Sequence, residues 1–257
     1  MSINTAAILD IFKFKRKNTI IHKLDPRTKL YYALVISILA LIFVDIIPLM
    51  IIFVSTIPMF IAAKSLRNWY YTIKGLFILV LIIVIIDTLF ISFSLAISMV
   101  FRLFSLITSF SLFFLTTHPD DFSQALIQMH IPYSFAFTLS LSVRFIPTLG
   151  TETQTVMEAQ MSRGLELQKG NMLKRVRNFI PIIVPMIVLS IRRALLIAES
   201  LESRGFGVSE TRTYLYKLKM SWKDYLIIVF LTLILVLSVI FVYYIGLPQF
   251  LIYKIPF

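Results

Sequence analysis

The sequence predicts an all-α integral membrane protein, with about five transmembrane helices and a cytoplasmic coupling domain of long helices bent by proline. Three observations lead to this fold class. Apolar residues make up 58% of the 257 residues and charged residues only 15%, well below the quarter that is usual in soluble domains. Several apolar runs are long enough to cross a bilayer. The basic residues gather between these runs, as they do in membrane proteins of fixed orientation.

Residues 30–115 are expected to form a membrane domain of about four helices. The apolar run from 30 to 63 would be roughly 50 Å long as a single helix, which is too long for one crossing. Asp45 and Pro48 lie in its middle, where they indicate an outer turn between two helices.

The second apolar run, residues 75–115, is also too long for one crossing. Asp87 and the break at Ser92 indicate an outer turn here as well. Between the two pairs of helices, residues 64–74 read as a basic loop rich in Trp and Tyr, which is typical of the cytoplasmic interface.

The distribution of lysine and arginine predicts the orientation of the chain. Seven of these residues precede Leu30, three lie in residues 64–74 and thirteen lie between His118 and Asp224. Because basic segments stay inside, the amino-terminal segment 1–29 and the domain 116–224 are expected in the cytoplasm. The net charge of +12 is then explained by topology, and no nucleic-acid partner is expected.

The carboxy-terminal segment, residues 225–257, is expected to form the last transmembrane helix followed by a short outer tail. Its apolar run from 225 to 247 is long enough to cross the bilayer alone. With five crossings the carboxy terminus lies outside, where only Lys254 would carry a positive charge.

The cytoplasmic domain 116–224 is predicted to contain one short and two long helices. Thr117 or Asp120 is a candidate cap for the short helix, which runs toward His130. Period-two alternation in residues 133–145 would read as a strand on its own, but a lone strand beside a bilayer leaves its backbone groups unpaired. A helix is therefore expected there.

Prolines are expected to shape both long helices. The first should run from Pro132 to Arg163 with a bend near Pro147. The second should run from about Asn171 to Arg204, and the two prolines inside it, Pro181 and Pro185, are expected to bend or break it.

Each long helix ends in the same tripeptide. Ser162-Arg163-Gly164 recurs 41 residues later as Ser203-Arg204-Gly205, and Glu158 precedes the first copy as Glu199 precedes the second. A single Arg-Gly is most simply a helix ending, in which glycine turns the chain and arginine answers the helix dipole. Two matched copies favour a further role, because each guanidinium can enter an acidic groove of a partner in a bidentate manner.

Together with three further segments in matching order, these motifs resemble the transmembrane T component (EcfT/CbiQ-like family) of energy-coupling factor (ECF) transporters. That family has a pair of Ala-Arg-Gly-like motifs ending two coupling helices, whereas this chain has serine at both alanine positions. The other segments that resemble the family are His22-Lys-Leu-Asp-Pro-Arg-Thr-Lys-Leu30, Thr116-Thr-His-Pro-Asp-Asp-Phe-Ser-Gln-Ala-Leu126 and Val143-Arg-Phe-Ile-Pro147.

The resemblance implies a non-enzymatic, energy-coupling subunit of an ABC-type importer for vitamins or transition-metal ions in the cell membrane. It implies that Arg163 and Arg204, with their flanking Ser and Gly, dock on two ATPase subunits, identical or different, supported by Glu158 and Glu199. It also implies that a membrane-embedded S component binds the substrate. No cofactor is expected in this chain, since ATP would be bound by the partners and no phosphate-binding Gly-x4-Gly-Lys loop occurs.

Two alternatives remain at this point. Residues 158–164 also approximate the Glu-Ala-Ala-x3-Gly coupling loop of a conventional ABC permease, although such a permease normally has one loop and this chain has two. A multispan lipid-modifying enzyme could use Asp120, Asp121 and a metal. The chain has no cysteine and only three histidines without ligand-like spacing, so no metal site is expected.

Arg102 is expected to pair with Asp87 or to extend toward the outer surface.

Overall fold

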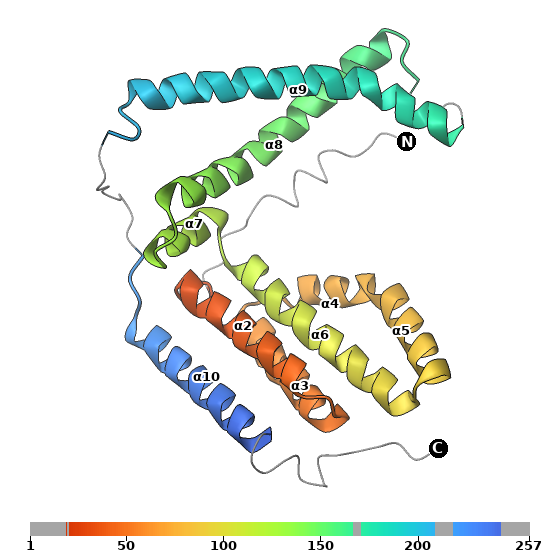
Figure 1. Ribbon diagram of the computed structural model, residues 1–257, viewed down its shortest axis with the longest axis vertical. Helices are drawn as coiled ribbons and strands as arrows, with labels where there is room; N and C mark the ends of the chain where they lie inside the picture. Colours follow the sequence, from red (N-terminus) through yellow and green to blue (C-terminus); the bar gives the residue numbers. More distant parts are fainter. Residues whose placement is uncertain (1–18, 20, 167–170, 209–217, 243–257) are drawn as a thin grey trace. The chain divides into compact units, whose positions relative to one another are not determined.

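The computed structural model describes residues 19, 21–166, 171–208 and 218–242, and every regular element in these ranges is a helix (Figure 1). The predicted all-α fold class is therefore confirmed. The described residues fall into two compact units. We call residues 19–133 and 218–242 the bundle unit, and residues 134–208 the crossed-helix unit. The predicted limits of the membrane and cytoplasmic domains concern the position of the bilayer, and they stay predictions.

The bundle unit is organised around one long helix, α6, which contacts four other helices of the unit: α2, α3, α4 and α5. Helices α7 and α10 pack on α2. The bounds of the seven helices are α2 Pro26–Ile42, α3 Ile46–Ala62, α4 Leu66–Gly75, α5 Phe77–Phe90, α6 Phe93–Thr116, α7 Pro119–Gln128 and α10 Trp222–Ile240.

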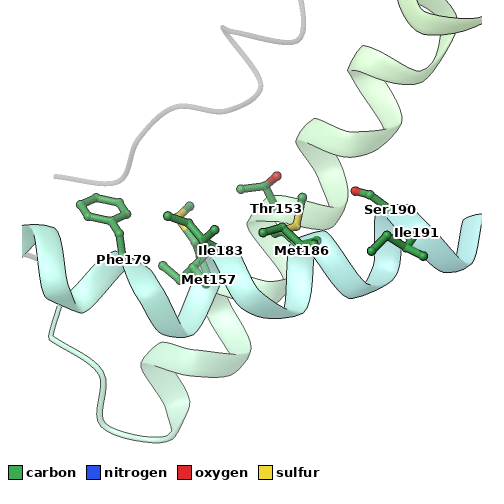
Figure 2. A pocket seen from close by; sticks show the side chains of 9 residues that line it. Thr153, Met157, Phe179, Ile183, Met186, Ser190 and Ile191 are labelled. Atoms are coloured by element: carbon green, nitrogen blue, oxygen red, sulfur yellow. The ribbon is translucent and has the colours of Figure 1, made fainter. Parts of the chain in front are cut away.

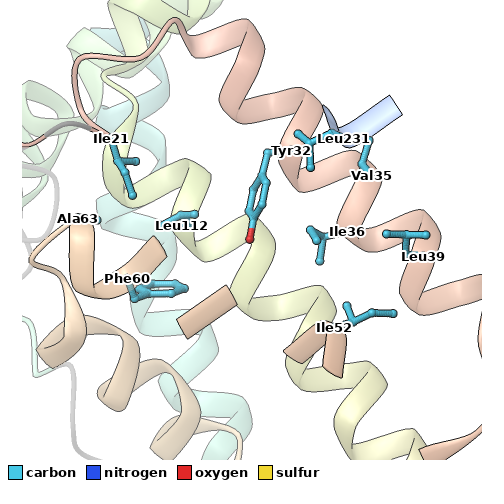
Figure 3. Close-up of a cluster of buried hydrophobic side chains, with 10 residues drawn as sticks. All are labelled: Ile21, Tyr32, Val35, Ile36, Leu39, Ile52, Phe60, Ala63, Leu112 and Leu231. Carbon is cyan, nitrogen blue, oxygen red and sulfur yellow. The ribbon is translucent and has the colours of Figure 1, made fainter. Parts of the chain in front are cut away.

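The core of this unit lies between α2, α3, α6 and α10. Figure 3 shows Val35, Ile36 and Leu39 of α2 beside Leu112 of α6 and Leu231 of α10. All five side chains are buried. By contrast, α5 contributes no buried residue at all. Helix α5 contacts α6 but leaves most of its apolar side chains exposed.

Both predicted turns between apolar helices are present. The first lies at residues 43–45, between α2 and α3, and the second lies at residues 91–92, between α5 and α6. At the second turn the backbone N–H of Leu95 donates to Ser92 Oγ over 3.3 Å, which caps the start of α6.

Helices α2 and α7 start with caps of different kinds. Asp25 caps α2 and Pro26 occupies its first position. The cap of α7 differs from the prediction of Thr117 or Asp120. It is His118, whose Nδ1 accepts the backbone N–H of Asp120 at 3.2 Å. An imidazole nitrogen can replace the usual carboxylate or hydroxyl acceptor, and Pro119 at the first position fixes this register.

Residues 64–74 were expected to be a loop, and the structure corrects this. Helix α4 occupies Leu66–Gly75 and joins α5 through Leu76 alone, with a bend of 47° between the two helices. The indole of Trp69 holds α4 on the bundle by packing against Phe53 and Phe60, with ring centroids 6.2 and 5.7 Å apart. This aromatic contact depends on the fold and is not visible as periodicity in so short a segment.

Arg102 on α6 was expected to pair with Asp87 or to extend toward the outer surface. Its Nε donates to the carbonyl of Ala40 at 3.1 Å and its Nη2 donates to the carbonyl of Phe43 at 2.8 Å. These carbonyls belong to the end of α2, where backbone acceptors have no partner within the helix. Arg102 therefore caps a neighbouring helix and does not pair with Asp87 in the described structure.

A buried polar joint connects the starts of α2 and α10. Asp224, which is only 1% exposed, accepts the backbone N–H of Asp25 at 3.0 Å and that of Ser221 at 2.8 Å. Nearby, Lys29 donates from Nζ to the carbonyl of Thr116 at 2.9 Å. Lys29 precedes the apolar run of α2. Burial lowers its pKa to about 8, although nearby aspartates act in the opposite direction. The polar groups of this joint thus hold α2, α6 and α10 in one arrangement.

The crossed-helix unit consists of two long antiparallel helices, α8 Tyr133–Ser162 and α9 Met172–Ser203. Figure 1 shows them crossing each other. Pro147 lies inside α8, and Pro181 with Pro185 lies inside α9. Neither helix is broken at these prolines, because each proline removes only one backbone hydrogen bond and the turns on either side persist.

The length and composition of the helices support several membrane crossings. In the described residues, three helical segments are long and apolar enough to cross a bilayer: Phe93–Thr116, Arg177–Ser203 and Trp222–Ile240. The bent pair of α4 and α5 would make a fourth, while α3 is a shorter apolar helix. The segment Arg177–Ser203 was expected in the cytoplasm because of its charged neighbours. This helical segment is nevertheless long and apolar enough to cross a bilayer.

Candidate coupling site

The two Ser-Arg-Gly motifs end their helices with the same backbone hydrogen bonds. After α8, Leu165 N–H donates to the carbonyl of Gln160 at 3.0 Å and Gly164 N–H donates to that of Met161 at 2.9 Å. After α9, Phe206 N–H and Gly205 N–H donate to the carbonyls of Leu201 and Glu202, also at 3.0 and 2.9 Å. Both endings are Schellman motifs, offset by the same 41 residues as the sequence repeat.

Glycine is required at both endings. Gly164 has φ +89° and Gly205 has φ +71°, a left-handed conformation that other residues adopt only with strain. An added Cβ would meet no atom within 4 Å at Gly164 and only Val208 Cγ2, at 3.7 Å, at Gly205. The need for glycine therefore comes from the backbone and not from crowding.

Serine also has the same local role in both motifs. Ser162 Oγ donates to the carbonyl of Ala159 at 2.8 Å, and Ser203 Oγ donates to that of Ser200 at 3.0 Å. Each hydroxyl is satisfied by its own helix, so the serine presents little more bulk than an alanine. The departure from the Ala-Arg-Gly pattern thus leaves the helix end unchanged.

The two arginines are placed for contact with another molecule. Arg163 and Arg204 are exposed, and neither guanidinium has a hydrogen-bond or ion-pair partner among the residues that the structure describes. Glu158, one turn before the first motif, accepts from Gln154 Nε2 at 2.8 Å, and Glu199 is exposed. These carboxylates do not neutralise the arginines within the described structure, so both positive charges stay available.

The antiparallel packing places the two motifs at opposite ends of the crossed-helix unit. Near the first motif, Gln160 Nε2 donates to the carbonyl of Pro181 at 3.2 Å. Near the second motif, Phe206 packs on Phe137 with ring centroids 5.0 Å apart. Each motif is therefore anchored beside the start of the other helix, and two separate partner surfaces can be reached.

An ion pair holds the middle of the crossing. Arg193 of α9 pairs with Glu152 of α8, and its guanidinium lies 5.8 Å from the ring centroid of Phe145. All three side chains come from the crossed-helix unit and join its two helices. The sequence analysis did not single out these residues. Arg193 is preceded by Arg192, and this adjacent pair in an apolar run was the signal that one arginine faces a partner helix.

Two apolar grooves lie on either side of this crossing. Figure 2 shows the first, of about 410 Å³, where Thr153 and Met157 of α8 face Phe179, Met186 and Ile191 of α9. The second groove, of about 600 Å³, lies toward the motif at the end of α9. Along α9 many large apolar side chains are exposed, including Ile183, Val184, Ile187 and Val188. This surface is suited to lipid or to an apolar partner.

The residues considered for a metal-dependent enzyme lie elsewhere. His118, Asp120 and Asp121 are at the start of α7 in the bundle unit, where His118 serves as the cap. Within the described ranges, no group of three or more His, Asp or Glu side chains is close enough to hold a metal ion. The structure thus gives these residues a role in starting a helix.

Comparison with known proteins agrees with these features. The family model described as CbiQ, cobalt transport protein, matches residues 17–215. An energy-coupling factor transporter transmembrane protein EcfT from Thermosediminibacter oceani is 30% identical over 237 residues, covering 80% of this chain and 88% of the relative. The EcfT proteins of Streptococcus equi subsp. equi and Ruminiclostridium cellulolyticum are 33% and 29% identical, covering 84% and 87% of this chain and 90% and 95% of the relatives.

A multi-pass helical protein with two exposed Arg-Gly helix ends belongs to the class of transporter membrane components. The chain is a member of the CbiQ/EcfT family of energy-coupling transmembrane proteins. The curated relatives carry the name of a transporter's transmembrane protein.

Proposed function

We propose that this chain is the energy-coupling subunit of an ECF-type importer for vitamins or transition-metal ions. In this proposal it transmits the ATP-driven motion of two ATPase subunits to a separate, membrane-embedded S component, and ATP is bound by the ATPases. The observation that carries the proposal is the pair of identical helix endings, each with an exposed arginine.

Each arginine is proposed to dock on one ATPase subunit. A helix end held by a Schellman motif presents the guanidinium in a fixed position, and a carboxylate can receive it through two parallel hydrogen bonds. Because Arg163 and Arg204 lie at opposite ends of the crossed helices, each contacts a different subunit. Closure of the two ATPases on ATP then moves both helices at once.

The apolar surface of the crossed helices is proposed to hold the S component. The two grooves beside the crossing and the exposed apolar residues of α9 supply this surface. Substrate specificity resides in the S component, so the same coupling chain serves one or several substrates depending on its partners.

The proposed orientation places the amino terminus and residues 116–224 in the cytoplasm and the carboxy terminus outside. Both arginine motifs then face the compartment that contains ATP. The excess of lysine and arginine in these segments supports this arrangement.

Charge reversal at the two helix ends tests the proposal. The variants Arg163→Glu, Arg204→Glu and the double variant are purified by an affinity tag from host membranes in mild detergent, and the retained proteins are identified. We expect each single change to weaken ATPase retention about tenfold to a hundredfold, since a charge-assisted hydrogen bond contributes about 1.5–3 kcal/mol. The double variant should retain no ATPase and support no uptake.

A matched control separates docking from total charge. Arg177→Glu with Arg192→Glu removes two exposed arginines of α9 away from the helix ends and should keep the ATPases bound. Full ATPase retention by the Arg163/Arg204 double variant would refute the docking role. Recovery of a second permease in place of an S component would favour a conventional ABC importer.

A further inference from the structure

Helix α4 has two unlike faces. Trp69 packs into the bundle against Phe53 and Phe60. Arg67, Tyr71 and Lys74 are spaced four and three residues apart, so they share one face of the helix, and all three are exposed. At 100° per residue these three positions lie about 140–200° around the axis from Trp69. The side that carries the positive charges therefore points away from the protein core.

Lys64 precedes α4, in the turn that follows α3. It adopts φ +51° where α3 ends, and backbone bonds from Lys64 N–H to Ile61 and from Ser65 N–H to Phe60 fix the turn. Lys64 is exposed as well. Arg67 and Lys74 thus occupy positions set by helical backbone, and no loop separates them.

No acidic residue compensates this charge within the local sequence. The whole segment between Asp45 and Asp87 contains neither aspartate nor glutamate. Arg67 instead lies 5.8 Å from the ring centroid of Tyr71, in a cation–π contact that leaves its charge unneutralised. A negative partner for Arg67 and Lys74 therefore has to come from outside this segment.

The neighbouring helices place this surface at the edge of a bilayer. Helix α5 follows after a single residue, and its apolar side chains are exposed, including Phe77 at 66% and Ile78 at 73%. The apolar helix α3 precedes α4 and is joined to it by residues 63–65. Tyr70 and Tyr71, at 61% and 55% exposed, are the residue type that accumulates at the level of the lipid headgroups.

We propose that α4 binds anionic phospholipid through Arg67, Tyr71 and Lys74. The two cations contact the phosphate of the headgroup, and the tyrosine hydroxyl adds a hydrogen-bond donor beside them. The acyl chains of the bound lipid lie along α5. Charge complementarity and direct continuity with a lipid-facing helix select this partner over a second protein.

Tryptophan fluorescence provides the test on the full chain. The protein contains two tryptophans, so Trp222→Phe leaves Trp69, on α4 itself, as the reporter. Trp222 is 75% exposed, and its replacement should not disturb packing. The reporter protein is placed in phosphatidylcholine bilayers containing phosphatidylglycerol, with bromine on the acyl chains of one lipid at a time, and quenching is compared at equal bromolipid content.

We expect brominated phosphatidylglycerol to quench Trp69 several times more effectively than brominated phosphatidylcholine, and the difference to shrink at high salt. Arg67→Gln with Lys74→Gln should abolish the preference, since each cation near an anionic surface contributes about 1 kcal/mol, or about fivefold. The charge-conserving pair Arg67→Lys with Lys74→Arg is the matched control and should keep most of the preference.

Three results would overturn the proposal. Equal quenching by the two lipids would mean that α4 has no headgroup preference. A preference that survives the neutral variant would place the anionic lipid at other residues. Efficient photocrosslinking of a benzoylphenylalanine at position 71 to a protein in host membranes would mean that a protein covers this face. Circular dichroism of each variant checks that the helices are intact.

Discussion

At Gly164 and Gly205 a single residue type decides how a coupling helix ends. Both have positive φ, whereas Gly75, at the end of α4, does not, and a Cβ there would meet no atom within 4 Å. The same residue therefore has opposite effects at these sites. At the two motifs glycine permits a backbone conformation in which alanine would be strained. At Gly75 glycine only adds conformational freedom to the unfolded chain.

Gly164→Ala and Gly205→Ala should each destabilise the local helix end by about 1–2 kcal/mol, because alanine is strained in the left-handed conformation. Faster amide hydrogen exchange in residues 158–165 or 199–206, measured by mass spectrometry, would show this fraying. Gly75→Ala is the matched control and should slow exchange at the end of α4. Unchanged exchange at both motifs would contradict the role given to glycine.

Asp224→Asn should lower the stability of the purified protein by about 1–3 kcal/mol. The buried carboxylate accepts two backbone N–H groups, and an asparagine offers only one acceptor oxygen, which leaves one donor unpaired. Thermal unfolding in detergent measures the change. Glu202→Gln, at an exposed carboxylate of α9, is the control and should unfold at the native temperature.

At the scale of the helical element, the crossing of α8 and α9 determines whether the two arginines move together. Arg193 joins the helices through Glu152 and Phe145. Such partly exposed pairs contribute about 0.5–1 kcal/mol each to stability. That amount is too small to decide whether the protein folds. The contacts of Arg193 instead limit the range of angles between the two helices.

Arg193→Met should widen the distribution of distances between the two motifs. Because the chain has no cysteine, spin labels can be attached to Met161→Cys and Glu202→Cys without background, and pulsed electron paramagnetic resonance measures their separation. The neighbouring substitution Arg192→Met is the control and should leave the distribution narrow. Restoration by the swapped pair Glu152→Arg with Arg193→Glu would attribute the effect to the ion pair.

Sequence patterns predicted the elements wherever a local rule applies. The turns at 43–45 and 91–92 follow from limits on helix length, and the two Arg-Gly endings follow from glycine chemistry. The repeat itself pointed to the site. All of these depend on residues that are near one another in the chain.

Features that depend on tertiary contacts were missed. The helical state of α4 and the carbonyl partners of Arg102 each require a neighbour that the sequence does not place. The cap of α7 is local, because His118 accepts the N–H of Asp120 two residues later, but an imidazole is not one of the usual cap side chains. Pro181 and Pro185 were expected to bend or break α9, and the helix continues through both. The pair of Glu152 and Arg193 joins residues 41 positions apart, beyond the reach of periodicity.

On the scale of the whole molecule, the orientation in the bilayer decides whether the motifs can meet ATP-driven partners. The turn between α2 and α3 and the exposed face of α4 are predicted on opposite sides of the membrane. Val44 is 50% exposed in that turn, and Asn68 is exposed on α4.

A membrane-impermeant maleimide applied to intact cells should label Val44→Cys and spare Asn68→Cys. After permeabilisation both should react, which controls for accessibility. The native chain, which lacks cysteine, gives the background. The reverse pattern would place the basic segments outside and would refute the proposed orientation.

The joint between Asp25 and Asp224 also bears on how the protein is made. The two residues are separated by 199 positions, so α2 leaves the ribosome long before its buried hydrogen-bond partner has been synthesised. During that interval the start of α2 lacks the carboxylate that later accepts its backbone N–H. The bundle is completed only when α10 arrives, and truncation of the nascent chain before that helix leaves it exposed to quality-control proteases.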